Sequence, residues 1–287
     1  MTGYLFRQSL WKIGMKNEKR ILFLDMDGTA LNDVHQLSRE NIEALKCAIE
    51  AGHEVVVTTG RPAANAEKLL RTYGLDRIGC RYVIAFNGGT VLDCASGEVL
   101  FSKALSLDHM KGLVEEARKA GIYLQVYEGN GVLTEKDDEN LAHYINKTGM
   151  PAKVVEDMRE SLREESCKAL AIDVHDHERL EQFRCHLADW AKDWANVFFS
   201  CAEYLEIVPK GICKGDALRA FCESQGVPVE NSIAAGDESN DLSMIQAAGV
   251  GCAVANALEL VKEEADYICQ RDNNHSAIQE IVERFMS

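Results

Sequence analysis

The stretch Ile21-Leu22-Phe23-Leu24-Asp25-Met26-Asp27-Gly28-Thr29 decides the fold of this chain. Its leading apolar residues are typical of a short buried strand, and Gly28-Thr29 indicates a turn directly after it. Asp25 and Asp27 lie at the carboxyl end of this strand, where open α/β sheets bind their ligands, and alternation lets both point the same way. Two such charges are accommodated by a metal ion or a shared proton. Taken alone, the pair also fits a solvated turn or part of a calcium loop.

Composition narrows the classes of partner. The chain has 287 residues, of which 46% are hydrophobic and 27% charged, and its formal net charge is −15. This charge argues against broad binding to nucleic acid or anionic membranes, but a local metal or lysine can still hold a small phosphorylated substrate. The ten cysteines include no Cys-x-x-Cys pair, and no apolar run has the length of a membrane span. We therefore expect a cytoplasmic protein that is a monomer or a homodimer.

Strand and helix patterns alternate at both ends of the chain and predict a Rossmann-like, doubly wound parallel sheet. The middle instead mixes hairpins with helices, which indicates an inserted α+β domain. We predict an N-terminal extension over 1–19, a core domain over 20–88 and 200–287, and the inserted domain over 89–199. The core strands are expected at 21–24, 54–59, 82–86, 232–235, 251–254 and 267–269. The insert is expected to hold a hairpin over 91–101, helices over 107–120, 139–147 and 178–193, and strands over 122–127, 131–134, 168–173 and 204–208.

Two further motifs offer groups that bind anions. Thr59-Gly60-Arg61 follows a predicted strand and supplies a hydroxyl and backbone N–H groups to phosphate oxygens, although an ordinary turn explains the tripeptide equally well. A lysine in the first turn of the helix after Lys210 is disfavoured by the helix dipole, and becomes sensible if it neutralises a phosphate or a carboxylate. Lys214 is preferred over Lys210 for this role.

The loop Gly236-Asp237-Glu238-Ser239-Asn240-Asp241 follows another predicted strand. Capping of the next helix explains one of its polar residues but not all of them. Excess carboxylate oxygen at a strand end suits a hard cation, and we predict Mg²⁺.

These motifs, in this order, resemble those of the haloacid dehalogenase superfamily of phosphohydrolases, and the insert resembles the type-IIB cap of the Cof-like subfamily. Supporting features are Asn87-Gly88-Gly89, Lys210 to Leu218 and the Ala255-Asn256-Ala257 turn. The departures are Ala30, which replaces a larger aliphatic residue, and His275-Ser276-Ala277, which replaces Gly-Val-Ala.

The resemblance implies roles for the acidic residues. Asp25 would be the nucleophile that forms an aspartyl-phosphate, and Asp27 would protonate the leaving group and then activate water. The metal would be held by Asp25, the backbone carbonyl of Asp27, Asp237 and Asp241.

The same resemblance implies that Lys214 is catalytic and that the phosphoryl group contacts Thr59, Gly60, Arg61, Lys214 and Asn240. The implied function is Mg²⁺-dependent hydrolysis of small phosphate monoesters, such as sugar phosphates or phosphorylated cofactors. Phosphomutase-type transfer and a non-catalytic phosphate sensor are the alternatives.

Two features of the insert stay ambiguous in the sequence. Tyr123, Gln125, Tyr127 and Glu128 are candidates to line a substrate site, and a strand face packed on its own helices explains them equally well. His175-Asp176-His177 could bind a metal, but a strand-to-helix turn with Asp176 as N-cap is the preferred interpretation.

Overall fold

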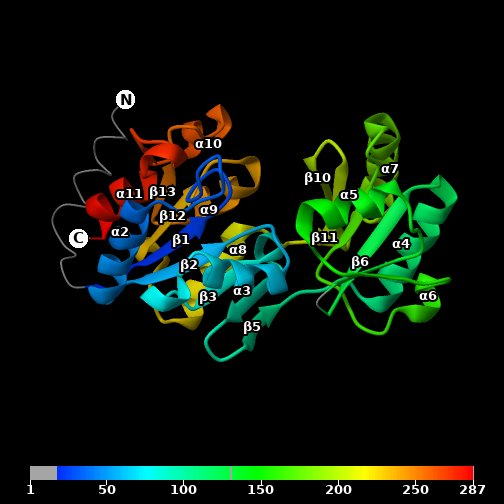
Figure 1. Ribbon diagram of the computed structural model, residues 1–287, viewed down its shortest axis with the longest axis horizontal. Coiled ribbons are helices and arrows are strands. Elements are labelled where there is room, and N and C mark those ends of the chain that lie inside the picture. Colours follow the sequence, from blue (N-terminus) through cyan, green and yellow to red (C-terminus); the bar gives the residue numbers. More distant parts are fainter. Residues whose placement is uncertain (1–17, 130, 287) are drawn as a thin grey trace. The chain divides into compact units, whose positions relative to one another are not determined.

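The computed structural model describes residues 18–129 and 131–286 (Figure 1). Their strands form an eight-stranded sheet of order β14-β13-β12-β1-β2-β3-β4-β5 and a six-stranded sheet of order β10-β11-β9-β6-β7-β8. The strands of the larger sheet are β1 (Ile21–Asp25), β2 (Glu54–Thr58), β3 (Tyr82–Ala85), β4 (Thr90–Asp93), β5 (Glu98–Ser102), β12 (Ser232–Gly236), β13 (Val250–Ala253) and β14 (Tyr267–Ile268). Those of the smaller sheet are β6 (Tyr123–Glu128), β7 (Gly131–Thr134), β8 (Ala152–Val154), β9 (Ala169–Ile172), β10 (Ala195–Cys201) and β11 (Tyr204–Pro209).

The described residues form two compact units. The first consists of residues 18–57, Arg71–Arg81 and 218–286, and the second of Thr58–Leu70 and Tyr82–Ala217. The predicted extension over 1–19 lies outside the described residues except for its last two, and the predicted boundaries of the inserted domain stay a prediction.

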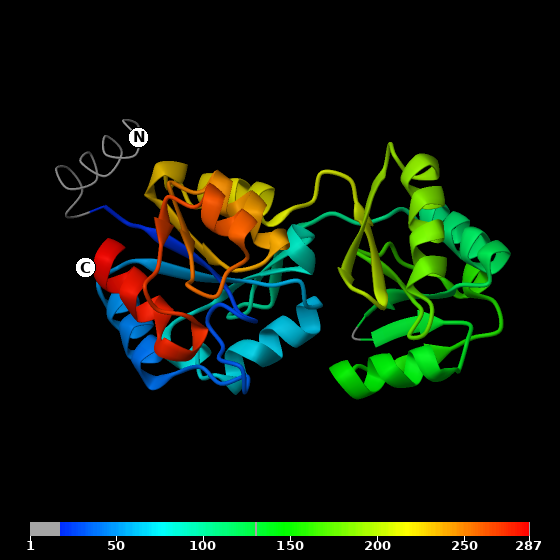
Figure 2. The ribbon, with the colours of Figure 1, turned by 90° about the horizontal axis from the view of Figure 1, so that it is seen from above.

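Parallel strands build the first unit, which confirms the predicted α/β class. β1 pairs in parallel with β12, with Leu24 opposite Ala235, and β12 in turn pairs in parallel with β13. Every residue of β1 and β12 is buried, as expected for a parallel sheet covered on both faces. Helices α2 (Arg39–Glu50) and α11 (Ala277–Phe285) lie on one face, and α9 (Leu242–Ala247) and α10 (Glu259–Glu264) on the other (Figure 2).

The hairpin predicted over 91–101 forms, but it belongs to the larger sheet. β4 pairs antiparallel with β3, and β5 pairs antiparallel with β4. The sequence pattern had indicated that this hairpin was part of the insert. The physical reason for the difference is the tight turn at Phe86–Gly88, which reverses the chain so soon that the next strand pairs with β3.

The smaller sheet lies within the second unit together with α4 (Leu107–Ala120), α5 (Glu139–Thr148), α6 (Met158–Ser161) and α7 (His177–Trp190). Leu113 of α4 and Phe183 of α7 pack with Val126 and Leu205 in one apolar core. β8, β10 and α6 are not predicted by the sequence pattern. β8 and α6 are too short to show a period, and most residues of β10 are only half-buried.

Two remaining helices complete the fold: α3 (Ala63–Thr72) and α8 (Lys214–Ser224). No helix among the described residues is long and apolar enough to cross a membrane. The ten cysteines all lie in the described part of the chain, and no disulfide joins them.

Candidate active site

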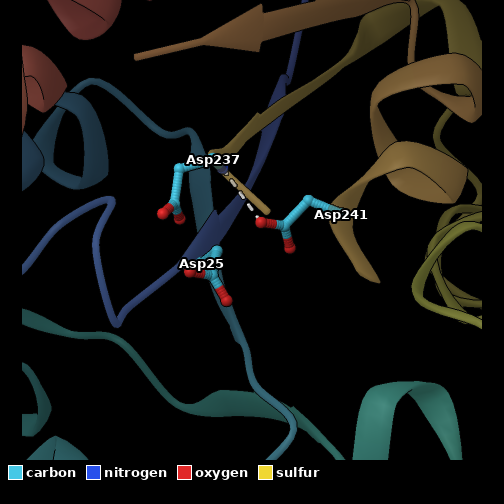
Figure 3. Close-up of side chains that lie close together, drawn as sticks. All are labelled: Asp25, Asp237 and Asp241. Atoms are coloured by element: carbon cyan, nitrogen blue, oxygen red, sulfur yellow. Dashed lines mark hydrogen bonds between the residues drawn. The ribbon is translucent and has the colours of Figure 1, made fainter. Parts of the chain in front are cut away.

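Three carboxylates meet at the carboxyl edge of the parallel strands. Asp25 is the last residue of β1, and Asp237 directly follows the neighbouring strand β12. Asp241 ends the short helical turn Ser239–Asp241 in the same loop. One side-chain oxygen of each residue lies within 4.8 Å of the others, and all three residues are buried (Figure 3). Chain topology thus joins two motifs that are far apart in sequence.

This cluster fits a divalent cation. Three carboxylates brought together away from water repel each other strongly, and oxygen ligands at this spacing are the donors that a hard cation such as Mg²⁺ prefers. Asp25, Asp237 and Asp241 are therefore brought together as predicted. Asp27 does not add its side chain to the cluster, and its predicted contribution through the backbone carbonyl stays a prediction.

The loop after β12 is folded around the side chain of Asp241. Its Oδ2 accepts hydrogen bonds from the backbone N–H of Asp237 at 2.9 Å and of Glu238 at 3.1 Å. These bonds fix the position of the Asp241 carboxylate beside Asp25 and Asp237 (Figure 3). Asn240 of the same loop is exposed.

The loop after β1 packs closely against Asp237. Gly28 has φ +81°, and a Cβ atom at this position would lie 2.3 Å from Asp237 Oδ2, so only glycine fits. The neighbouring Thr29 is fully buried and donates its hydroxyl to Asp237 Oδ1 at 2.6 Å. Asn256 Nδ2 donates to the carbonyl oxygen of Gly28 at 2.8 Å. Thr29 and Asn256 lie in motifs that are visible in the sequence, but the motifs alone do not indicate these contacts.

Asp25 and Asp27 have different environments despite their spacing. Asp25 is buried, whereas 45% of the Asp27 side chain is exposed. Asp27 Oδ1 lies 3.7 Å from Nδ1 of His35. The buried carboxylate belongs to the ligand cluster, and the exposed one can exchange protons with solvent.

The second unit carries the Thr59 motif. Thr59 is buried, its N–H donates to Ile84 O at 2.8 Å, and its carbonyl oxygen accepts from Asn87 N at 3.1 Å. Its hydroxyl oxygen accepts from Arg61 N at 3.1 Å, which leaves the hydroxyl proton to be donated. Gly60 lies against the side chain of Asn87, so this asparagine supports the motif, a role that the sequence did not reveal.

Lys214 begins α8 and is fully buried, whereas Lys210 is exposed. This difference supports the choice of Lys214 made from the sequence. The start of α8 meets the turn after β3, because a Cβ on Gly88 would lie 2.3 Å from the carbonyl oxygen of Cys213. The Thr59 motif and Lys214 are thus both tied to the turn that begins at Phe86.

The other candidate metal site is a turn. Asp176 caps α7 by accepting from Arg179 N at 3.0 Å, as predicted. Within residues 18–129 and 131–286, the only group of three possible metal ligands is the Asp25 cluster.

The chain is similar in sequence and in structure to known proteins. A family model of haloacid dehalogenase-like hydrolases matches residues 22–281. The HMP-PP phosphatase of Cronobacter sakazakii is 28% identical over 249 residues, covering 87% of this chain and 89% of that protein. The 5-amino-6-(5-phospho-D-ribitylamino)uracil phosphatase YcsE of Bacillus subtilis is 29% identical over 250 residues, with the same coverage. A haloacid dehalogenase-like hydrolase from Bacteroides thetaiotaomicron matches with a TM-score of 0.84 and 30% identity, over 93% of this chain and 99% of that one.

Proposed function

The chain belongs to the family of haloacid dehalogenase-like hydrolases and is a phosphohydrolase, and from this premise we propose that it hydrolyses small phosphate monoesters with Mg²⁺. The observation that carries the proposal is the cluster of Asp25, Asp237 and Asp241 at adjacent strand ends. The names of the two phosphatase relatives describe different organic groups, which supports a small phosphorylated metabolite, such as a sugar phosphate or phosphorylated cofactor, as the substrate class.

Asp25 acts as the nucleophile in this proposal. A carboxylate oxygen of Asp25 bonds to phosphorus while the bond from phosphorus to the ester oxygen breaks, and the alcohol leaves with a proton from Asp27. Water then attacks the aspartyl-phosphate, gives its proton to Asp27 and releases phosphate. The exposure of Asp27 supports this role, because its proton can be exchanged with solvent between the steps.

Mg²⁺ would be held by the carboxylates of Asp25, Asp237 and Asp241 and by the backbone carbonyl of Asp27. When bound, it supplies the positive charge that offsets the repulsion between an anionic nucleophile and an anionic phosphate. The hydrogen bonds that Asp241 accepts from the loop N–H groups orient its carboxylate for this purpose.

The phosphoryl oxygens are contacted in this proposal by Thr59, Gly60, Arg61, Lys214 and Asn240. The Thr59 hydroxyl can donate its proton to a phosphoryl oxygen, because its bond with Arg61 N uses the hydroxyl oxygen as acceptor and not the proton. Lys214 contributes a charge to both the phosphate and Asp25, and its complete burial makes that charge effective in a low dielectric.

We propose that the protein acts in the cytoplasm. The net charge of −15 supports a protein that acts on small metabolites without binding nucleic acid or membranes. The absence of disulfides among the ten cysteines supports a reducing cytoplasm. We propose a monomer or homodimer.

A panel of phosphate esters assayed with and without Mg²⁺ tests the proposal. Asp25→Asn is expected to abolish turnover and phosphoenzyme formation while the far-UV circular dichroism is unchanged. Asp189→Asn, which removes the same charge from an exposed position on α7, is the matched control and is expected to keep full activity. Substantial activity in Asp25→Asn would reject the nucleophile assignment. Dependence on a bisphosphate activator would favour a mutase, and failure to cleave any ester would favour a sensor.

A further inference from the structure

The turn that carries Asp27 contains a flexible residue. The turn is closed by a hydrogen bond from the N–H of Leu31 to the carbonyl oxygen of Met26 at 2.8 Å, and Asp27 lies inside it. Gly28 follows with φ +81°, and glycine is required there because a Cβ atom would collide with Asp237. Glycine also leaves the backbone free to adopt other conformations. The turn therefore needs further contacts if Asp27 is to keep one position.

Asn256 supplies the first of these contacts. Its Nδ2 donates to the carbonyl oxygen of Gly28 at 2.8 Å, and its Oδ1 accepts from the backbone N–H of Asn273 at 3.0 Å. Because Oδ1 is held by this N–H, the NH₂ group of the amide is directed to Gly28. The backbone beside Asn256 is fixed as well, since Ala255 N donates to Arg271 O at 3.1 Å. The contact with Gly28 thus comes from a well-held side chain.

Asn273 supplies the second contact, at the other end of the turn. Its Nδ2 donates to the carbonyl oxygen of Leu31 and to Oδ1 of Asp33, both at 3.1 Å. Asn274 donates to Oδ2 of Asp33 at 3.1 Å and accepts from the N–H of Asp33 at 3.2 Å. Asn273 is buried. Two adjacent asparagines near the C-terminus therefore hold the segment that follows the turn.

The segment that contains Asp33 also lies beside the Asp27 carboxylate. Nδ1 of His35 is 3.7 Å from Oδ1 of Asp27. His35 has a left-handed backbone, with φ 53°, which is held by a hydrogen bond from its N–H to Asn32 O and by one from the Tyr73 hydroxyl to its carbonyl oxygen, both at 2.8 Å. All these residues belong to the first unit. A displacement of the segment would therefore change the surroundings of Asp27.

Stability is a weak reason for the contact between Asn256 and Gly28. Asn256 is exposed, so water would satisfy the Gly28 carbonyl oxygen if the side chain were missing, and the folded state would lose little. A water molecule does not fix the direction of that carbonyl group in the way that an oriented amide does. The contact therefore acts mainly on the geometry of the turn that carries Asp27.

We propose that Asn256 and Asn273 are positioning residues that hold Asp27 where its carboxyl gives a proton to the leaving ester oxygen. This inference rests on the proposed function. The two contacts lie on either side of the turn, at Gly28 and Leu31, whereas Asp25 is positioned separately by the paired strand β1. Loss of a contact displaces the acid relative to the nucleophile, and a displacement of about 1 Å costs about 100-fold in rate.

Single-turnover rates of two esters test the inference. p-Nitrophenolate is a stable anion that leaves without a proton, whereas the alkoxide of an alkyl phosphate needs a proton from Asp27. A misplaced acid therefore lowers the ratio of the alkyl rate to the aryl rate, while a defect in the metal site or the nucleophile slows both esters. The alkyl ester is the one that the wild-type protein cleaves fastest, and release of the alcohol is measured with enzyme in excess.

Asn256→Ala is expected to lower the ratio of the two rates about tenfold, and the reference variant Asp27→Asn is expected to lower it further. Asn273→Ala removes the second contact and is expected to change the ratio in the same direction. Because Asn256 is exposed, Asn256→Ala is expected to keep the far-UV circular dichroism of wild type. Gln246→Ala removes an exposed amide that donates to Glu264 in the same unit, and this matched control is expected to keep the wild-type ratio.

The outcomes separate this inference from the proposed function. If Asn256→Ala slows both esters by the same factor, or slows neither, its contact is only structural and the inference is wrong. If Asp27→Asn leaves the ratio unchanged, Asp27 is not the acid, and the inference fails with that assignment while hydrolysis itself stands. Cleavage of no ester by the wild-type protein rejects the proposed function, and the inference with it.

Discussion

The hydroxyl of Thr29 donates a 2.6 Å hydrogen bond to Oδ1 of Asp237, a residue 208 positions further along the chain. The bond joins the loop after β1 to the loop after β12 and fixes one oxygen of a carboxylate in the Asp25 cluster. The second oxygen of Asp237 is packed against Gly28. Both oxygens of Asp237 are therefore positioned by the loop after β1.

The first prediction concerns this bond. Thr29→Val keeps the volume but removes the donor, so Asp237 can rotate, and we expect Mg²⁺ affinity to fall about 10- to 100-fold. Thr29→Ser keeps the hydroxyl and is expected to bind almost as tightly as wild type. Calorimetric titration with Mg²⁺ measures both, and equal affinity in Thr29→Val and wild type would contradict the prediction.

The second prediction concerns the binding of Mg²⁺ by the carboxylate cluster. Mg²⁺ is expected to stabilise the folded protein by about 2.7 kcal/mol at a concentration of one hundred times Kd, measured as a rise in Tm over the value in EDTA. Asp25→Asn is expected to lose most of this rise, because one of the three carboxylates that would hold the ion is gone. Asp189→Asn should behave like wild type under both conditions.

The third prediction concerns the pH dependence of stability in the second unit. Glu135 bonds to the Arg118 guanidinium and accepts from Met158 N at 2.7 Å, and the Arg118 hydrogen bond lowers the pKa of Glu135 below its usual value. A lowered folded-state pKa gives stability that is present above the unfolded-state pKa and is lost as pH falls through the folded-state pKa.

We therefore expect Glu135→Gln to reduce the free energy of unfolding by about 1 kcal/mol at pH 7, a value lowered by the exposure of Arg118. Urea denaturation at pH 7 and pH 3 is the measurement, and the difference from wild type should shrink at pH 3. Glu178→Gln controls for the loss of a charge. A difference of the same size at both pH values would count against this account.

The fourth prediction concerns cysteine reactivity. Burial raises the pKa of the Cys80 thiol to about 12, whereas Cys47 is exposed. Because the thiolate is the reactive form, iodoacetamide at pH 8 should alkylate Cys47 rapidly and leave Cys80 unmodified until the protein is unfolded. Peptide mass spectrometry over time measures both sites, and rapid alkylation of native Cys80 would show that its environment is more open.

Much of the fold was predictable because the local signals are strong. The apolar run before Asp25 gave β1, and Ser38 marked the start of α2, where its side chain accepts from Asn41 N. The same signals failed where tertiary pairing decides. The hairpin after Gly89 has no feature in its own sequence that determines which sheet it joins. The reversal of the chain at Phe86 brings the hairpin next to β3, so it pairs with the larger sheet.

The candidate site shows the same division. The acidic motifs at Asp25 and Asp237 were visible because each combines a buried strand with excess carboxylates. The roles of Thr29 and Asn87 were hidden, since each acts through one hydrogen bond to a residue distant in sequence.

The left-handed backbone at Phe86 has a consequence for protein engineering. Glycine adopts this conformation without strain, so Phe86→Gly would relieve about 1–2 kcal/mol of backbone strain at this position. The same change would remove a buried aromatic ring, and the loss of such a ring costs about 3–5 kcal/mol. The packing of the ring therefore outweighs the strain, so selection for heat tolerance would keep phenylalanine at a position where backbone conformation alone favours glycine.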